Sequence, residues 1–158
     1  MLFGDSICLK FSPHFLDKKR TNNTCYIVRH TDSRYNVLMA HTCDALIVSC
    51  IDFRFQKHIR KWLDENFGDK TFDYVGYAGG SKDLETIMKQ LDISVRLHEI
   101  KHVVLMHHEN CGAYGDESTP EKHAEDLLKA EKAIKKKYPK LKVDLFYILL
   151  DGQFNEVK

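Results

Sequence analysis

Two short segments carry side chains whose types and spacing suit metal chemistry. Residues 50–54 read Cys-x-Asp-x-Arg, and residues 108–112 read His-x-x-Cys-Gly. Two thiolates and one imidazole, from Cys50, Cys111 and His108, are a common ligand set for Zn²⁺. Three protein ligands leave the fourth tetrahedral position open, which distinguishes a catalytic zinc site from a structural one. The sequence therefore predicts one zinc ion per chain, bound by these three side chains.

Each of these residues also has an ordinary structural interpretation. Cys50 would then be a buried thiol at a strand end, and His108 a capping or core histidine. Asp52 and Arg54 would form a plain salt bridge. His107 adjoins His108 and is a second candidate ligand, but the two-residue gap of the second motif favours His108. The presence of both motifs in one chain favours the metal site.

The rest of the chain must bring the two segments together. From residue 44 onward, short apolar runs alternate with segments whose apolar residues recur at helical spacing. The runs are typical of strands buried in a parallel sheet, and the spaced residues are typical of amphipathic helices. Strands are expected at 45–50, 72–77, 103–106 and 145–150, and helices at 55–67, 81–95 and 120–138.

This order of elements predicts an α/β fold. We expect an open parallel sheet of about four strands, in the order 2-1-3-4, with helices on both faces. The first and third strands are neighbours in that order, and the two motif segments leave their carboxyl ends. Ligands bind at the carboxyl ends of strands in such sheets. Cys50 is therefore expected to lie beside His108 and Cys111.

Composition argues against several other classes of protein. The length of 158 residues suits one compact domain, and a formal net charge of +1 offers little attraction for nucleic acid. No apolar run approaches the roughly 18 residues of a membrane span, and no secretory signal is visible. We therefore expect a cytoplasmic protein whose five cysteines stay reduced. Of these, Cys8, Cys25 and Cys43 have no partner motif.

Residues 1–38 fit the alternating pattern poorly. We expect them to form an N-terminal arm or extension, and residues 39–158 to form the zinc domain. One hypothesis makes Met39, directly before the first strand, the natural start of the protein. The other is an arm that packs on a partner subunit.

Several histidines and aromatic residues outside the motifs have two possible roles. Three histidines are interpreted as surface residues of helices or helix ends: His98, His102 and His123. Three aromatic residues either line a substrate channel or, as the simpler interpretation, pack against neighbours: Phe53, Tyr77 and Tyr114.

The two motifs resemble those of the β-class carbonic anhydrases, which carry Cys-x-Asp-x-Arg and His-x-x-Cys. The resemblance covers about residues 44–155, and residues 78–80, Ala-Gly-Gly, are similar to the glycine turn of that family. At Phe53 and at residues 76–77, Gly-Tyr, the chain departs from the family pattern, and it is short. It resembles a small, divergent member.

The resemblance implies roles for particular residues. Cys50, His108 and Cys111 would bind the zinc, and Asp52 and Arg54 would form a catalytic dyad beside it. The resemblance also implies a homodimer whose sites lie near the subunit contact.

The implied activity is the reversible hydration of carbon dioxide to bicarbonate by a metal-bound hydroxide. Zinc with two thiolates and a neutral histidine has no net charge, so it acidifies water less than zinc with three neutral ligands. Arg54 can add positive potential and hold Asp52 away from the open metal position. One alternative is hydrolysis of carbonyl sulfide or carbon disulfide on the same scaffold. Another is a zinc-binding protein without turnover.

Overall fold

A computed structural model describes residues 42–158 of the chain. The predictions for the N-terminal arm at 1–38, for Met39 as a start, and for Cys8 and Cys25 fall outside the described residues. No helix within residues 42–158 is long and apolar enough to cross a membrane.

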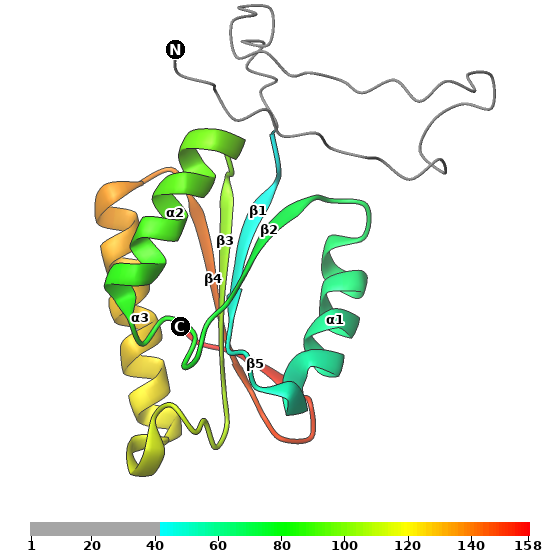
Figure 1. The fold of residues 1–158 in the computed structure, drawn as a ribbon, viewed down its shortest axis with the longest axis vertical. Coiled ribbons are helices and arrows are strands. Elements are labelled where there is room, and N and C mark those ends of the chain that lie inside the picture. Colours follow the sequence, from blue (N-terminus) through cyan, green and yellow to red (C-terminus); the bar gives the residue numbers. More distant parts are fainter. Residues whose placement is uncertain (1–41) are drawn as a thin grey trace, which may run out of the picture. The chain divides into compact units, whose positions relative to one another are not determined.

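Strands and helices alternate along the described chain as the apolar pattern predicts (Figure 1). The helices are α1 (Phe53–Phe67), α2 (Leu84–His98) and α3 (Pro120–Lys137), with a short 3₁₀ turn, η3 (Gly115–Glu117), before α3. The strands are β1 (Ala45–Ser49), β2 (Phe72–Gly76), β3 (His102–His108), β4 (Lys142–Ile148) and β5 (Phe154–Glu156).

The five strands form one sheet in the order β2-β1-β3-β4-β5. β1 to β4 are parallel, which confirms the predicted order of the first four strands and the α/β class. β5 was not predicted, and it pairs antiparallel with β4. The Asp151-Gly152 turn behind β4 therefore returns the chain to the sheet edge, and Gly152 adopts the positive φ of 89° that this turn requires.

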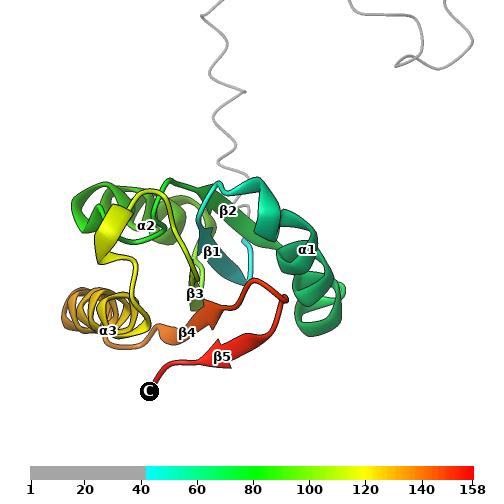
Figure 2. The same ribbon diagram turned by 90° about the horizontal axis from the view of Figure 1, so that it is seen from below.

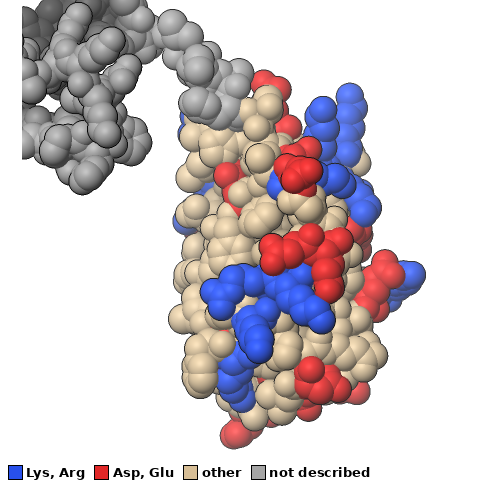
Figure 3. All heavy atoms as spheres, turned by 90° about the vertical axis from the view of Figure 1, so that its right-hand side faces the viewer, with Lys and Arg blue, Asp and Glu red and all other residues tan. Residues whose placement is uncertain are grey.

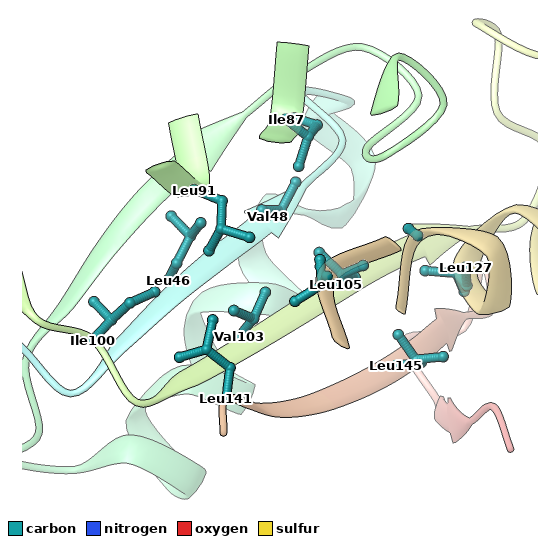
Figure 4. Close-up of a cluster of buried hydrophobic side chains, with 12 residues drawn as sticks. Leu46, Val48, Ile87, Leu91, Ile100, Val103, Leu105, Leu127, Leu141 and Leu145 are labelled. Atoms are coloured by element: carbon teal, nitrogen blue, oxygen red, sulfur yellow. The ribbon is translucent and has the colours of Figure 1, made fainter. Parts of the chain in front are cut away.

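Apolar side chains fill both faces of the sheet. The larger core lies between the sheet and the helices α2 and α3, and Leu46, Leu105 and Leu127 are among its members (Figure 4). On the opposite face, α1 packs Phe55 and Ile59 against the sheet (Figure 2). β1 is buried along its whole length because it lies between these two layers. The predicted placement of helices on both faces is confirmed.

Polar side chains fix where the helices begin. Asp52 accepts a hydrogen bond from the backbone N–H of Arg54 (3.0 Å) and caps α1. Thr119 caps α3, with proline at its first position, as the sequence predicts. α2 begins later than expected, because Asp83 rather than Ser81 is its capping residue. Asp52 thus has a structural role at the very position where the dyad was predicted.

Candidate metal centre

The structure brings Cys50, His108 and Cys111 together at the carboxyl ends of β1 and β3. One ligand atom from each lies within 4.8 Å of the other two, and all three residues are buried. The sulfur atoms of Cys50 and Cys111 are 3.9 Å apart. Their meeting follows from the sheet order, because β1 and β3 are direct neighbours.

The ring of His108 is oriented for a ligand at one nitrogen. Its Nδ1 donates to the backbone carbonyl of Glu109 (2.9 Å), which leaves Nε2 as the nitrogen with a free lone pair. Nε2 is buried and has no hydrogen-bond partner within residues 42–158. The ring is held in place by Phe55, whose centroid is 4.1 Å away. Burying an imidazole nitrogen without a hydrogen-bond partner costs free energy, unless a bound ligand takes up its lone pair.

The three donors fit a zinc ion in chemistry and in spacing. With Zn–S bonds of about 2.3 Å and tetrahedral angles, two thiolates lie roughly 3.8 Å apart. The observed separation of 3.9 Å between the sulfur atoms of Cys50 and Cys111 is close to that value. The backbone N–H of Gly79 also points at the Cys50 sulfur, 3.4 Å away, and stabilises negative charge there. The residues present could therefore hold zinc with one position left for water.

The Cys50 and Cys111 thiols affect each other's ionisation. The hydrogen bond with the Cys111 thiol lowers the pKa of Cys50 well below its usual range despite its burial. The same contact, together with burial, raises the pKa of Cys111. One proton is therefore shared by the pair, and a divalent cation bound between the sulfur atoms would release it.

Asp52 and Arg54 form a fork-shaped ion pair. Arg54 Nη2 donates to Asp52 Oδ2 (2.7 Å), and Nε donates to Oδ1 (3.0 Å). Arg54 Nη2 also donates to the backbone carbonyl of Asn110 (2.8 Å), a contact that the sequence did not predict. Asn110 lies between His108 and Cys111 and has a positive φ of 54°. Arg54 therefore connects the Asp52 carboxylate to the loop that carries two of the candidate ligands.

This ion pair keeps Asp52 ionised. The hydrogen bonds from Arg54 lower the pKa of the Asp52 carboxyl to about 2, although partial burial acts in the opposite direction. At neutral pH the carboxylate is an acceptor only. It can accept a hydrogen bond from a neighbouring group, but it cannot donate one.

A buried chain of hydrogen bonds lies behind the site and was missed from the sequence. His107 Nε2 accepts from the backbone N–H of Ser81 (3.0 Å), so its Nδ1 carries the proton and donates to His123 Nδ1 (3.1 Å). His123 Nε2 then donates to Ser118 Oγ (3.1 Å). Ser118 Oγ also accepts from the backbone N–H of Cys111 (2.8 Å). This chain links the backbone N–H of Ser81, after the glycine turn, to the backbone N–H of Cys111.

The surface interpretation of His123 is therefore wrong. The residue is fully buried, because it shares the inner stripe of α3 with Leu127, Ala130 and Ile134. The spacing of four residues between His123 and Leu127 places both on one face of the helix, and this pattern could have predicted the burial of His123. His98 and His102 are half-buried rather than exposed, and each pairs with a carboxylate, Asp73 and Asp144 respectively.

The three aromatic residues differ in their surroundings. Tyr114 is buried and packs against His123, with ring centroids 4.1 Å apart, so packing explains it. Tyr77 is half-buried, and its hydroxyl donates to Asp83 (3.1 Å). Phe53 is 84% exposed, so packing within the described chain does not explain it.

Gly80 lies where a side chain would disturb the hydrogen-bond chain that begins at His107. It has a positive φ of 61°, and a Cβ there would lie 2.7 Å from His107 Cδ2. We predict that Gly80→Ala lowers the free energy of unfolding by about 3 kcal/mol, through backbone strain and overpacking. Gly115→Ala is the matched control, because its φ is also positive (56°) and the space around it is open. Gly115→Ala should lower the free energy of unfolding by only about 1 kcal/mol. Urea unfolding of both variants measures the difference, and equal losses would contradict the prediction.

A family model and two relatives match most of the chain. A family model named "Putative carbonic anhydrase" matches residues 40–158. Uncharacterised proteins of Rickettsia bellii and Rickettsia conorii are 31% and 33% identical to the chain over 150 residues. These matches cover 83% of this chain and, respectively, 92% and 81% of the two relatives.

Solved structures with a similar fold are carbonic anhydrases. The enzyme from Glaciozyma antarctica has a TM-score of 0.56 at 15% identity, over 78% of this chain and 87% of that one. The enzyme from Streptococcus mutans has a TM-score of 0.54 at 17% identity, over 75% and 83% of the two chains. A β-carbonic anhydrase from Trichomonas vaginalis has a TM-score of 0.52 at 16% identity, over 75% and 84%. At these identities the likeness concerns the fold. Taken with the family match over residues 40–158, it shows that the chain belongs to this carbonic anhydrase family, as a divergent β-carbonic-anhydrase-like member.

Proposed function

We propose that the protein is a zinc-dependent carbonic anhydrase that reversibly hydrates carbon dioxide to bicarbonate. The observation that carries this proposal is the buried cluster of Cys50, His108 and Cys111, with the Asp52–Arg54 pair beside it. A zinc ion bound there would acidify a water molecule and supply the nucleophile for the carbon atom of carbon dioxide.

Each residue of the site has a distinct task in this proposal. Cys50, Cys111 and His108 Nε2 hold the metal, and the carbonyl of Glu109 fixes the tautomer of the histidine. Asp52 accepts the hydrogen bond of the nucleophile and orients it. Arg54 keeps that carboxylate ionised and away from the metal.

Stopped-flow hydration with a pH indicator tests the proposal. The zinc-loaded protein should hydrate carbon dioxide faster than buffer, and Cys50→Ser should reduce the rate to the background while lowering the zinc content. His102→Ala is the matched control, because His102 lies at the amino end of β3, away from the cluster, and its replacement should leave the rate and the zinc content unchanged. Zinc-loaded wild-type protein without activity would contradict the proposal and favour a zinc-binding protein without turnover.

We also propose that the protein acts as a homodimer. Within residues 42–158, β2 is an edge strand of the sheet, and its exposed side chains include Phe72 and Tyr74. Ile51 and Phe53, which flank Asp52, are 61% and 84% exposed. Open strand edges and exposed apolar residues favour burial against a second subunit. A second copy covering this surface would also shield the site from bulk water.

Phe53→Asp should shift this assembly to monomers, because a carboxylate cannot be buried at an apolar contact without a large cost. Leu128→Asp is the matched control, since Leu128 is 39% exposed on α3, which packs on β3 and β4 rather than on β2. Light scattering at micromolar concentration gives the molar mass of each variant. A monomeric wild-type protein, or a dimeric Phe53→Asp variant, would contradict the prediction.

The proposed partners are small molecules and a second subunit, with no nucleic acid. On the face that carries α1, a group of lysine and arginine side chains is bordered by groups of aspartate and glutamate (Figure 3). One such contact is the Lys61–Glu65 pair (3.8 Å). A cytoplasmic location is part of the proposal, because the site needs Cys50 and Cys111 as free thiolates, and a reducing compartment maintains them.

A further inference from the structure

A second cluster of metal-ligating side chains lies at the opposite end of the sheet from the candidate metal centre. It consists of Cys43, Asp73 and His98, whose ligand atoms all lie within 4.8 Å of one another. Cys43 precedes β1, Asp73 is the second residue of β2, and His98 is the last residue of α2. The amino ends of the strands therefore carry this cluster, whereas the first centre lies at their carboxyl ends (Figure 1).

Neighbouring groups hold the cluster in a defined arrangement. The two carboxylate oxygens of Asp73 lie 2.9 and 2.8 Å from His98 Nδ1. The hydroxyl of Ser94, one turn earlier on α2, donates to the same carboxylate. The Cys43 thiol donates to the backbone carbonyl of Ala45 (3.5 Å). Such supporting hydrogen bonds orient metal ligands in proteins.

The chemistry of the three donors suits zinc. A thiolate, a carboxylate and an imidazole are all zinc ligands, and their two negative charges would balance one divalent cation. Zinc binding would replace the hydrogen bond between Asp73 and His98. It would need side-chain movements on the order of 1 Å to bring the donors to tetrahedral spacing. All three residues are half-buried, so an ion can reach them.

A polar cavity borders the cluster at Cys43. Its volume is about 270 Å³, and it is lined by Thr42, Cys43, Asp44, Thr71, Glu99 and Lys101. The charges of Lys101 and Glu99 are opposite, and Asp44 adds a further negative charge. The cavity therefore carries a net negative charge, which favours entry of a cation.

We propose that Cys43, Asp73 and His98 bind a second Zn²⁺ ion, with water as the fourth ligand. The ion would connect the entry to β1, the edge strand β2 and the end of α2. This inference does not depend on catalysis at the first centre.

Zinc content of the full chain tests the proposal. After zinc loading and desalting, the wild-type protein should contain two zinc ions per chain, and Cys43→Ala and His98→Ala should each contain one. His102→Ala is the matched control, because His102 Nε2 makes a similar contact with Asp144 (2.8 Å) but belongs to no three-ligand cluster in the described chain. It should retain both ions.

The Cys50→Ser, Cys111→Ser double variant separates the two centres. It should keep one zinc ion, and Co²⁺ in its place should show a sulfur-to-cobalt charge-transfer band that Cys43→Ala removes. Cys43→His should restore metal binding without this band. If the double variant does not fold, the counts for the single variants decide.

Two outcomes would overturn the proposal. In the first, the wild-type protein holds a single ion, which disappears when Cys50 is replaced, so that the trio is only a hydrogen-bonded cluster. In the second, Cys43→Ala and His98→Ala retain as much zinc as the wild-type protein. Neither outcome depends on a hydration rate, so failure here is distinguishable from failure of the proposed activity.

Discussion

Arg54→Ala should retain the zinc at the candidate centre and lower the rate of carbon dioxide hydration by about 10- to 100-fold, the usual effect of losing a group that positions metal-bound ligands. Arg54 makes hydrogen bonds to both oxygens of Asp52 and to the carbonyl of Asn110. Without it, the Asp52 carboxylate is free to turn toward the metal and compete with water for the fourth position. The measurement is the stopped-flow rate together with zinc content.

The chain offers controls for both members of the pair. Arg60→Ala removes an equally charged, exposed side chain from the same helix and should leave the rate unchanged. Asp52→Asn should slow hydration, because an amide is a poor proton acceptor. It should not unfold α1, because asparagine is as good a helix cap as aspartate. Unchanged rates in both Arg54→Ala and Asp52→Asn would show that the pair is a plain surface salt bridge.

The parallel sheet and the candidate centre could be predicted because both depend on strong local signals. β1 and β3 are almost wholly buried, so their sequences are continuous apolar runs. The Cys-x-Asp-x-Arg and His-x-x-Cys segments directly follow or end those two runs. Once strands one and three are neighbours, the ligands of the two segments must meet.

Other features could not be predicted because they depend on contacts distant in sequence. β5 has three residues and little apolar pattern, and only its pairing with β4 and the packing of Phe154 on Trp62 fix it. The cluster at Cys43 and Asp73 forms because β1 and β2 pair, and neither residue belongs to a recognisable motif. The Arg54 contact with Asn110 requires the positive φ of that asparagine, which no pattern indicates.

The two buried histidines that were not predicted should make stability sensitive to acid. Burial lowers the pKa of His123 to about 4, with a smaller contribution from repulsion by His108. Burial also lowers the pKa of His107 to about 3. In the unfolded chain both rings would titrate near pH 6.5. Below that pH the unfolded state therefore binds more protons than the folded state. The stability that these two neutral histidines allow is fully present above about pH 6.5 and is lost as the pH falls toward 4.

His123→Gln should remove one of these two contributions, because glutamine does not titrate and its amide can still reach Ser118. His123 alone accounts for about 3 kcal/mol between pH 6.5 and its folded pKa, since each unit of pKa shift corresponds to about 1.4 kcal/mol. Between pH 6 and 4.5, the unfolding free energy of the wild-type protein should fall more steeply than that of the variant, by about 1.1 kcal/mol per pH unit. Urea unfolding of both proteins at equal zinc loading gives the two slopes, so acid release of the metal affects both alike. Equal slopes would contradict the prediction, because they would mean that the imidazole of His123 accepts a proton as easily in the folded protein as in the unfolded chain. The full burial of His123, between its hydrogen-bond partners His107 and Ser118, argues against that outcome.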